Sequence, residues 1–202
     1  MNESLEALSG RYPQLKSCEG AVARAFDLLL ACYRGGGKVL TCGNGGSAAD
    51  AEHVVGELMK KFRKHRAVDP AVAAQLPAEL AAKLEGALPA VSLVSMSGIL
   101  TAFANDVAWE TAFAQQVLGL GRPGDVLIAL STSGDSANCV AAAQVARAKG
   151  MRVVSLTGKG GGRLFALSDA AINVPETETY KVQELHLPVY HALCAALEDA
   201  LF

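Results

Sequence analysis

Apolar residues along this chain recur in two patterns, which together predict strands that alternate with helices. Short, almost uninterrupted apolar runs bounded by glycine, proline or polar residues indicate strands that are buried on both faces. Five runs have this character: 38–42, 91–95, 125–130, 152–157 and 170–174. Apolar residues at helical spacing predict helices between them. These helices are expected over 3–34 with a break near Pro13, over 46–64, 97–119 and 136–149, and after the fifth strand.

This alternation predicts an α/β fold, with a five-stranded parallel sheet covered by helices on both faces. In such sheets a ligand binds beyond the carboxyl ends of the strands, where the strand order reverses. Two loops of small residues, Gly43–Ser47 and Ser131–Ser136, follow the first and the third predicted strand. A chain of 202 residues can bury a full core as one domain, so we expect a single domain over 1–202.

Composition excludes several classes of protein. Apolar residues make up 51% of the chain and charged residues 19%, which is typical of a globular protein. The net charge of −2 gives no support to a nucleic-acid partner. The five cysteines are odd in number and include no C-x-x-C pair, which favours a reducing cytoplasm over a disulfide framework. The sequence has no apolar signal-peptide segment and no run long enough to span a membrane, so we expect a cytoplasmic protein without a membrane partner.

Both small-residue loops have the composition of a phosphate cradle. The glycines of Gly43–Ser47 would let backbone N–H groups approach an anion at a helix N-terminus, although an ordinary tight turn with a serine cap fits equally well. This loop has neither the Walker nor the dinucleotide-binding spacing. The loop Ser131–Ser136 has four hydroxyls in six residues and can donate several hydrogen bonds to a phosphate. A helix cap would need only one hydroxyl, so this loop favours an anion site.

His53 and Glu57 are four residues apart and therefore lie on one face of a predicted helix. This spacing suits two ligands of one metal ion, or a base oriented by its neighbour. A surface ion pair is the alternative. The basic run 60–66 that follows is typical of a solvated helix end, with a role in attracting an anionic substrate as a second interpretation.

The last helix carries a second group of polar residues. Gln183 and His191 are a little over two helical turns apart and can share a broad face, with His186 between them. The alternative is one buried core histidine and one solvated histidine. Pro188 predicts a kink or a restart of the helix. Earlier in the chain, Asp106 is a candidate for binding sugar hydroxyls or for ending a helix.

Taken together, these segments resemble the sugar isomerase (SIS) family, in its phosphoheptose isomerase branch. The matching motifs occur in one order over nearly the whole chain, apart from about residues 66–89. They are Gly43-Asn44-Gly45-Gly46-Ser47, Asp50-x-x-His53-x-x-x-Glu57, Ala104-Asn105-Asp106, Gly124-Asp125-Val126-Leu127-Ile128, Ser131-Thr132-Ser133-Gly134-x-Ser136, Leu156-Thr157-Gly158-Lys159-x-Gly161-Gly162 and Gln183-Glu184-x-His186.

The resemblance implies a three-layer sandwich with the flavodoxin-like SIS fold, in which N-terminal helices over 1–35 pack in the oligomer. It implies an enzyme that interconverts sedoheptulose 7-phosphate and glycero-manno-heptose 7-phosphate in the cytoplasm. It also implies a homotetramer with sites across subunits, and one zinc ion per site. Aldose–ketose exchange needs a base, an acid and a group that stabilises an enediolate oxygen.

The resemblance also assigns roles to residues. Zinc would be held by His53, Glu57, Gln183 and His191, of which Glu57 and His191 would also be the acid–base pair. The phosphate would be bound by Ser131, Thr132, Ser133 and Ser136. The remaining residues at the substrate would be Asn44, Gly45, Gly46, Ser47, Asp106 and Gln183.

The chain departs from the resemblance in two places. Residues 66–89 form an alanine-rich, helical insertion that could reshape the pocket or act as a lid. Tyr180 stands where the isomerases carry an aspartate of the site. These departures leave an isomerase of another sugar phosphate as an alternative. A non-catalytic SIS protein that binds phosphosugars or a replication initiator is a further alternative, against which the presence of Glu57 and His191 argues.

Overall fold

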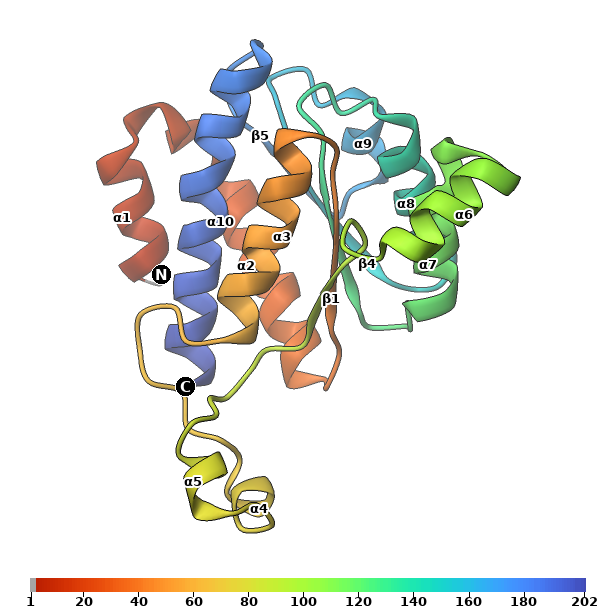
Figure 1. The fold of residues 1–202 in the computed structure, drawn as a ribbon. Coiled ribbons are helices and arrows are strands. Elements are labelled where there is room, and N and C mark those ends of the chain that lie inside the picture. The colour runs from red at the N-terminus through yellow and green to blue at the C-terminus, as the bar shows by residue number, and fades with distance from the viewer. Residues whose placement is uncertain (1–2) are drawn as a thin grey trace.

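The computed structural model describes residues 3–202 as a five-stranded parallel sheet between two layers of helices (Figure 1). The strands run in the order β2-β1-β3-β4-β5. Their bounds are β1 (Val39–Cys42), β2 (Ala90–Ser92), β3 (Val126–Leu130), β4 (Arg152–Thr157) and β5 (Ala170–Asn173). The predicted α/β fold with helices on both faces is confirmed.

The strand order places both small-residue loops at one point of the sheet. The chain adds β2 on one side of β1 and then crosses over to add β3 on the other side. Strand β1 pairs with β3 from Val39 opposite Val126 to Cys42 opposite Ala129, and both strands are buried throughout. The carboxyl ends of β1 and β3 therefore lie side by side where the strand order reverses, which is where such folds bind ligands.

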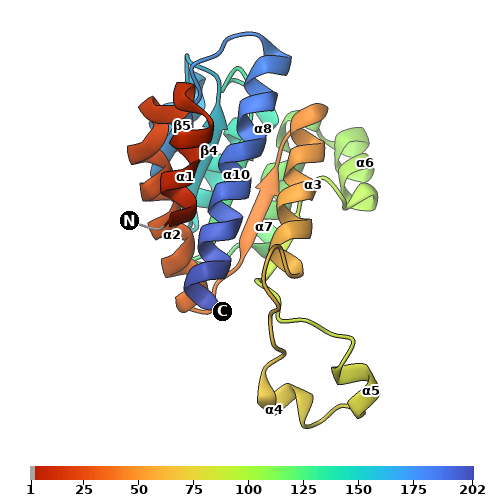
Figure 2. The ribbon, with the colours of Figure 1, turned by 90° about the vertical axis from the view of Figure 1, so that its left-hand side faces the viewer.

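One layer of helices includes the two that carry the candidate acid–base and metal-binding residues. It consists of α1 (Glu3–Arg11), the 3-10 helix η1 (Pro13–Cys18), α2 (Glu19–Arg34), α3 (Gly46–Met59) and α10 (Thr179–Leu201). Helices α3 and α10 lie next to each other in both views (Figures 1 and 2). Apolar residues of these helices and of one face of the sheet form a single core cluster.

The opposite layer completes the sandwich. It consists of α6 (Ser97–Asp106), η2 (Trp109–Thr111), α7 (Ala112–Leu120), α8 (Ala137–Ala148) and α9 (Gly162–Leu167). These helices form the second core cluster with the other face of the sheet. Among the helices within 3–202, none combines the length and apolar character needed to cross a bilayer.

The helix boundaries differ from the predicted ones in three places. The helix predicted over 46–64 ends at Met59, because the backbone of Lys60 is extended. The helix predicted over 97–119 is interrupted at Val107, after which η2 and α7 follow. Helix α9 was not predicted. Pro188 lies inside α10, which continues without interruption on both sides of it.

The segment 66–89, which was predicted to be an insertion, extends away from the body of the molecule (Figures 1 and 2). It contains two single-turn helices, α4 (Pro70–Ala73) and α5 (Ala78–Ala81), and Asp69 caps the first by accepting a hydrogen bond from the Ala71 amide. At its base the two arms are joined by a hydrogen bond from the Gly86 amide to the Arg66 carbonyl.

A fully buried ion pair fixes the base of this insertion to α10. Arg66 Nε donates to Glu198 Oε1 at 2.8 Å, and both side chains are 0% exposed. Glu198 also accepts from the amides of Phe62, Arg63 and Lys64. The Arg66 guanidinium in turn donates to the carbonyls of Glu57 and Leu58 and so satisfies the end of α3. The expectation of a wholly solvated basic run is therefore wrong for Arg66.

We expect Glu198→Gln to lower the free energy of unfolding by about 3–5 kcal/mol, because it leaves the buried Arg66 charge without its partner. Urea unfolding at fixed protein concentration measures this loss. Glu178→Gln, at the residue just before the same helix, is the matched control, because it removes only an exposed pair with Lys181 and should cost about 0.5 kcal/mol or less. Equal losses in the two variants would contradict the importance of the buried pair.

Candidate active site

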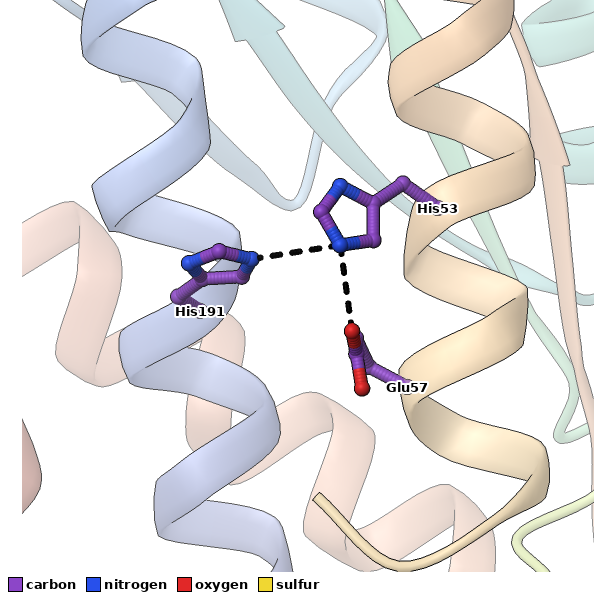
Figure 3. A group of neighbouring side chains, drawn as sticks. All are labelled: His53, Glu57 and His191. Atoms are coloured by element: carbon purple, nitrogen blue, oxygen red, sulfur yellow. Dashed lines mark hydrogen bonds and ion pairs between the residues drawn. The ribbon is translucent and has the colours of Figure 1, made fainter. Parts of the chain in front are cut away.

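Two residues of α3 and one of α10 bring their polar atoms to one point (Figure 3). His53 Nε2 lies 3.0 Å from Glu57 Oε1, and His191 Nε2 lies 3.5 Å from His53 Nε2. One ligand atom from each residue lies within 4.8 Å of the other two. The three side chains are called the triad below. Two imidazoles and a carboxylate are a donor set that holds catalytic zinc.

The triad depends on how α3 and α10 lie against each other. On α3, the spacing of four residues places His53 and Glu57 one turn apart on the same face. Gln183 contacts Ser47 near the start of α3, and Glu198 binds the segment just beyond its end. The two helices therefore run in the same direction, and this brings His191 level with His53.

A buried tyrosine, Tyr190, links the Nδ1 side of His53 to Asp50. The Tyr190 hydroxyl lies 2.9 Å from His53 Nδ1 and 3.1 Å from Asp50 Oδ1, and the residue is only 2% exposed. Sequence reasoning quoted Asp50 within a motif but gave it no role, and it missed Tyr190. The available signal was position, because Asp50 is one helical turn before His53 and Tyr190 directly precedes His191.

Charges around the triad set the protonation of its members. Burial alone would raise the pKa of Glu57, but hydrogen bonds and charges from Lys60 and His53 outweigh it and hold the pKa below its usual value. Burial lowers the pKa of His191, neighbouring His53 and Arg11 lower it further, and Glu57 opposes this only in part. At neutral pH Glu57 is therefore a carboxylate and His191 a neutral imidazole.

The hydroxyl loop after β3 lies at the carboxyl edge of the sheet. Its first and last hydroxyls, on Ser131 and Ser136, are 2.8 Å apart. The N-cap residue of α8, Ser136, makes no side-chain cap hydrogen bond, so its hydroxyl does not serve as the ordinary helix cap. The loop rests on the start of α9, where Arg163 pairs with Asp135. This supporting arginine was also missed by the sequence reasoning.

The loop after β1 is joined to the hydroxyl loop by a pair of amides. Asn44 Nδ2 donates to Asn138 Oδ1, and Asn138 Nδ2 donates to Asn44 Oδ1, each at 2.8 Å. Asn138 is buried in the first turn of α8. This reciprocal pair orients Asn44 and fixes the two loops relative to each other.

Of the remaining predicted site residues, Gln183, Gly45 and Gly46 lie at the glycine turn, and Asp106 lies on a different helix, α6. Gln183 lies over the glycine turn, where its amide nitrogen is 3.5 Å from Ser47 Oγ and a Cβ on Gly46 would approach it to 2.7 Å. Gly45 holds the turn with a φ of 56°. Asp106 lies at the end of α6 and accepts a hydrogen bond from its neighbour Asn105.

The site therefore has two parts at different heights along α3. The glycine turn, the hydroxyl loop and Gln183 are at the carboxyl edge of the sheet. The triad begins six residues beyond Ser47, which is roughly 9 Å along the helix axis. A cavity of about 210 Å³ opens on the other side of His191, with Arg11, Phe62 and Pro188 in its wall.

Proteins of known family are similar to this chain over most of its length. The family model described as SIS domain matches residues 7–87 and 80–158. A phosphoheptose isomerase from Rhodospirillum rubrum is 44% identical over 188 residues, which are 93% of this chain and 90% of the relative.

Solved structures of phosphoheptose isomerases are also similar to this chain. A phosphoheptose isomerase from Neisseria gonorrhoeae has a TM-score of 0.77 and 35% identity, with 98% of this chain and 94% of that chain covered. A phosphoheptose isomerase from Francisella tularensis has a TM-score of 0.79 and 30% identity, with 96% and 93% covered.

His186, also on α10, belongs to neither part of the site. It is fully buried, and neither ring nitrogen has a hydrogen-bond partner of good geometry among residues 3–202, although the Thr157 backbone is nearby. Burial lowers the pKa of His186 to about 4, and Thr157 opposes this only in part. Of the two sequence interpretations of His186, the structure matches the buried core histidine.

We expect the wild-type protein to lose stability as the pH falls from about 6.5 toward 4. The unfolded chain protonates His186 near pH 6.5, whereas the folded chain resists protonation down to about pH 4, so acid favours unfolding. His186→Leu should remove about 2 kcal/mol of the loss between pH 7 and pH 5. Urea unfolding of both proteins in the presence of a chelator measures the difference. Parallel stability curves for the two proteins would contradict this assignment.

Proposed function

The chain belongs to the SIS domain family and, within it, to the phosphoheptose isomerases, and from this premise we propose that it interconverts sedoheptulose 7-phosphate and glycero-manno-heptose 7-phosphate. The reaction is an aldose–ketose isomerisation, in which a proton moves between adjacent carbons through an enediol or enediolate. The single observation that carries this proposal is the convergence of His53, Glu57 and His191 on one point.

The phosphate group of the substrate binds at the carboxyl edge of the sheet. Ser131, Thr132, Ser133 and Ser136 supply hydroxyl donors, and the start of α8 adds backbone donors and a favourable dipole. The glycine turn with Asn44 and Ser47 lies beside them across the β1–β3 boundary. With the phosphate held there, the sugar chain extends along α3 toward the triad.

The triad fits a zinc ion. Tetrahedral ligands about 2.0–2.1 Å from zinc lie roughly 3.3–3.4 Å apart. The corresponding distances here are 3.0 Å from His53 to Glu57 and 3.5 Å from His191 to His53. We assign His53, Glu57 and His191 as ligands; the resemblance adds Gln183, which within one chain lies at the glycine turn and not at the triad. Bound zinc would polarise a substrate oxygen as a Lewis acid.

The side chains of the triad supply the acid and the base. Glu57 is ionised at neutral pH, as a base that removes a proton from carbon must be. His191 faces the triad through Nε2. It would be a ligand when zinc is bound there, and the proton donor to the substrate oxygen when Nε2 carries a proton and no metal. Lys60 lies 3.1 Å from Glu57 Oε2 and keeps this oxygen pointed away from His53.

The two departures from the family pattern lie outside the triad. The insertion leaves the end of α3 and extends away from the sheet, which supports an unchanged substrate rather than a lid (Figure 2). Tyr180 is 57% exposed in the first turn of α10. We propose that it lies at the rim of the pocket and that the heptose phosphate remains the substrate.

We also propose that the protein works as a cytoplasmic homotetramer with sites between subunits. The side chain of His53 is 42% exposed in the single chain. An isomerase must keep water away from its enediolate, and such exposure supports a site that a neighbouring subunit completes.

We expect Glu57→Gln to lower kcat for sedoheptulose 7-phosphate by about 10²- to 10⁴-fold, because the amide cannot act as the base. A coupled assay on zinc-loaded protein measures the rate. Glu52→Gln is the control on the same helix, since Glu52 is exposed and contacts Ser95. Wild-type protein that leaves sedoheptulose 7-phosphate unchanged would overturn the proposed function.

Ser133→Ala tests the phosphate site separately. Ser133 is exposed in the hydroxyl loop, and a lost hydrogen bond to a charged group costs about 1.5–3 kcal/mol. We expect KM to rise by about 10- to 100-fold with kcat little changed, because the phosphate contact is present in both the ground state and the transition state. A fall in kcat at unchanged KM would contradict this role.

A further inference from the structure

We propose that Tyr190 and Asp50 are positioning residues, which hold the His53 proton on Nδ1 and leave Nε2 free to bind the metal ion. This inference rests on the zinc site proposed above. It concerns two residues outside that ligand set, and it can be tested separately from catalysis.

The hydroxyl of Tyr190 sits between two groups that both could bond to it. His53 Nδ1 is 2.9 Å away and Asp50 Oδ1 is 3.1 Å away. A phenol has one proton to donate, and a carboxylate accepts it more strongly than an imidazole nitrogen does. With the proton directed to Asp50, the tyrosine oxygen can only accept, and His53 must provide an Nδ1–H. The other ring nitrogen of His53 then carries a lone pair.

Burial of Asp50 makes this arrangement the favoured one. Its second oxygen, Oδ2, is buried and has no hydrogen-bond partner within the described residues 3–202. If Tyr190 donated to His53 instead, both oxygens of Asp50 would lack a donor. A buried acceptor without a partner costs about 1–3 kcal/mol, and more when it is charged. The carboxylate of Asp50 therefore draws the tyrosine proton to itself.

Glu57 favours the other tautomer of His53. Its carboxylate is 3.0 Å from Nε2, and in the absence of metal it favours a proton on that nitrogen. A metal ion can bind Nε2 only when the proton is elsewhere. Asp50 and Tyr190 offset the pull of Glu57 because they stabilise the proton at Nδ1.

Packing of the rings reinforces the hydrogen bonds. The Tyr190 ring meets the His53 ring edge-on at a centroid distance of 5.4 Å, and it meets the His191 ring at 5.0 Å. The two imidazoles are themselves nearly perpendicular at 5.0 Å. One buried tyrosine therefore restricts the rotation of both histidine ligands. Partners behind ligating histidines typically change metal affinity by 10- to 100-fold.

Tyr190→Phe is the decisive variant, because it keeps the ring and removes the hydroxyl. We expect its zinc affinity to fall by about 10- to 100-fold, measured by competition with a chromophoric chelator on metal-free protein. Tyr33→Phe is the control, since the Tyr33 hydroxyl on α2 has no hydrogen-bond partner within residues 3–202 and its removal should leave affinity unchanged. Thermal unfolding of each metal-free variant confirms that it is folded.

A second measurement does not involve zinc. Nitrogen-15 chemical shifts of the His53 ring in metal-free protein report which nitrogen carries the proton. We expect the fraction protonated at Nε2 to increase in Tyr190→Phe and in Asp50→Asn relative to wild type. Unchanged zinc affinity together with an unchanged tautomer fraction in Tyr190→Phe would overturn the proposal. Wild-type protein that binds zinc and shows these changes but does not isomerise the sugar would overturn the proposed function alone.

Discussion

The packing of α3 against α10 is the contact on which both parts of the site depend. Residues more than 130 positions apart in the chain meet there at three successive levels. Gln183 lies over Ser47 at the first level, Tyr190 bonds to His53 at the second, and Glu198 binds Arg66 at the third. Apolar residues of both helices fill the space between these contacts. A displacement of α10 by one residue would move His191 by about 1.5 Å along the axis and would separate it from His53.

The two parts of the site use different electrostatics. The proposed phosphate end consists of hydroxyls and backbone donors, a set that can bind an anion without a fixed positive charge. The triad end has a carboxylate that pairs with Lys60 and contacts His53. The separation of these two ends along α3 favours weak coupling between phosphate binding and protonation of the triad. The fold can therefore hold its substrate firmly without disturbing the base.

The sequence predicted the elements of the fold better than their ends. All five strands were recognised, because buried parallel strands are continuous apolar runs. Helix α9 was missed because it is short, begins at a glycine and follows the glycine-rich segment 158–161. The end of α3 was predicted too far along the chain. The helix end is stabilised by Arg66 and its partner Glu198, which is 132 residues away in the sequence and could not be recognised from local pattern. The spacing of His53 and Glu57 identified two of the three triad residues, and resemblance to a family supplied His191. Tyr190 and Asp50 were not recognised, because their role exists only when two helices meet.

The contact between the hydroxyl loop and the start of α9 has a consequence for how this site can diverge. Gly134 has a φ of 73°, and a Cβ on it would overlap the carbonyl of Gly161, while a Cβ on Gly162 would overlap the backbone of Gly134. Close contact with the start of α9 therefore fixes the backbone of the hydroxyl loop. The side chains of Thr132 and Ser133 are not constrained in this way. Substitutions at Thr132 and Ser133 could therefore change which anion the loop prefers. The backbone of the loop would keep its conformation as long as the three glycines are retained.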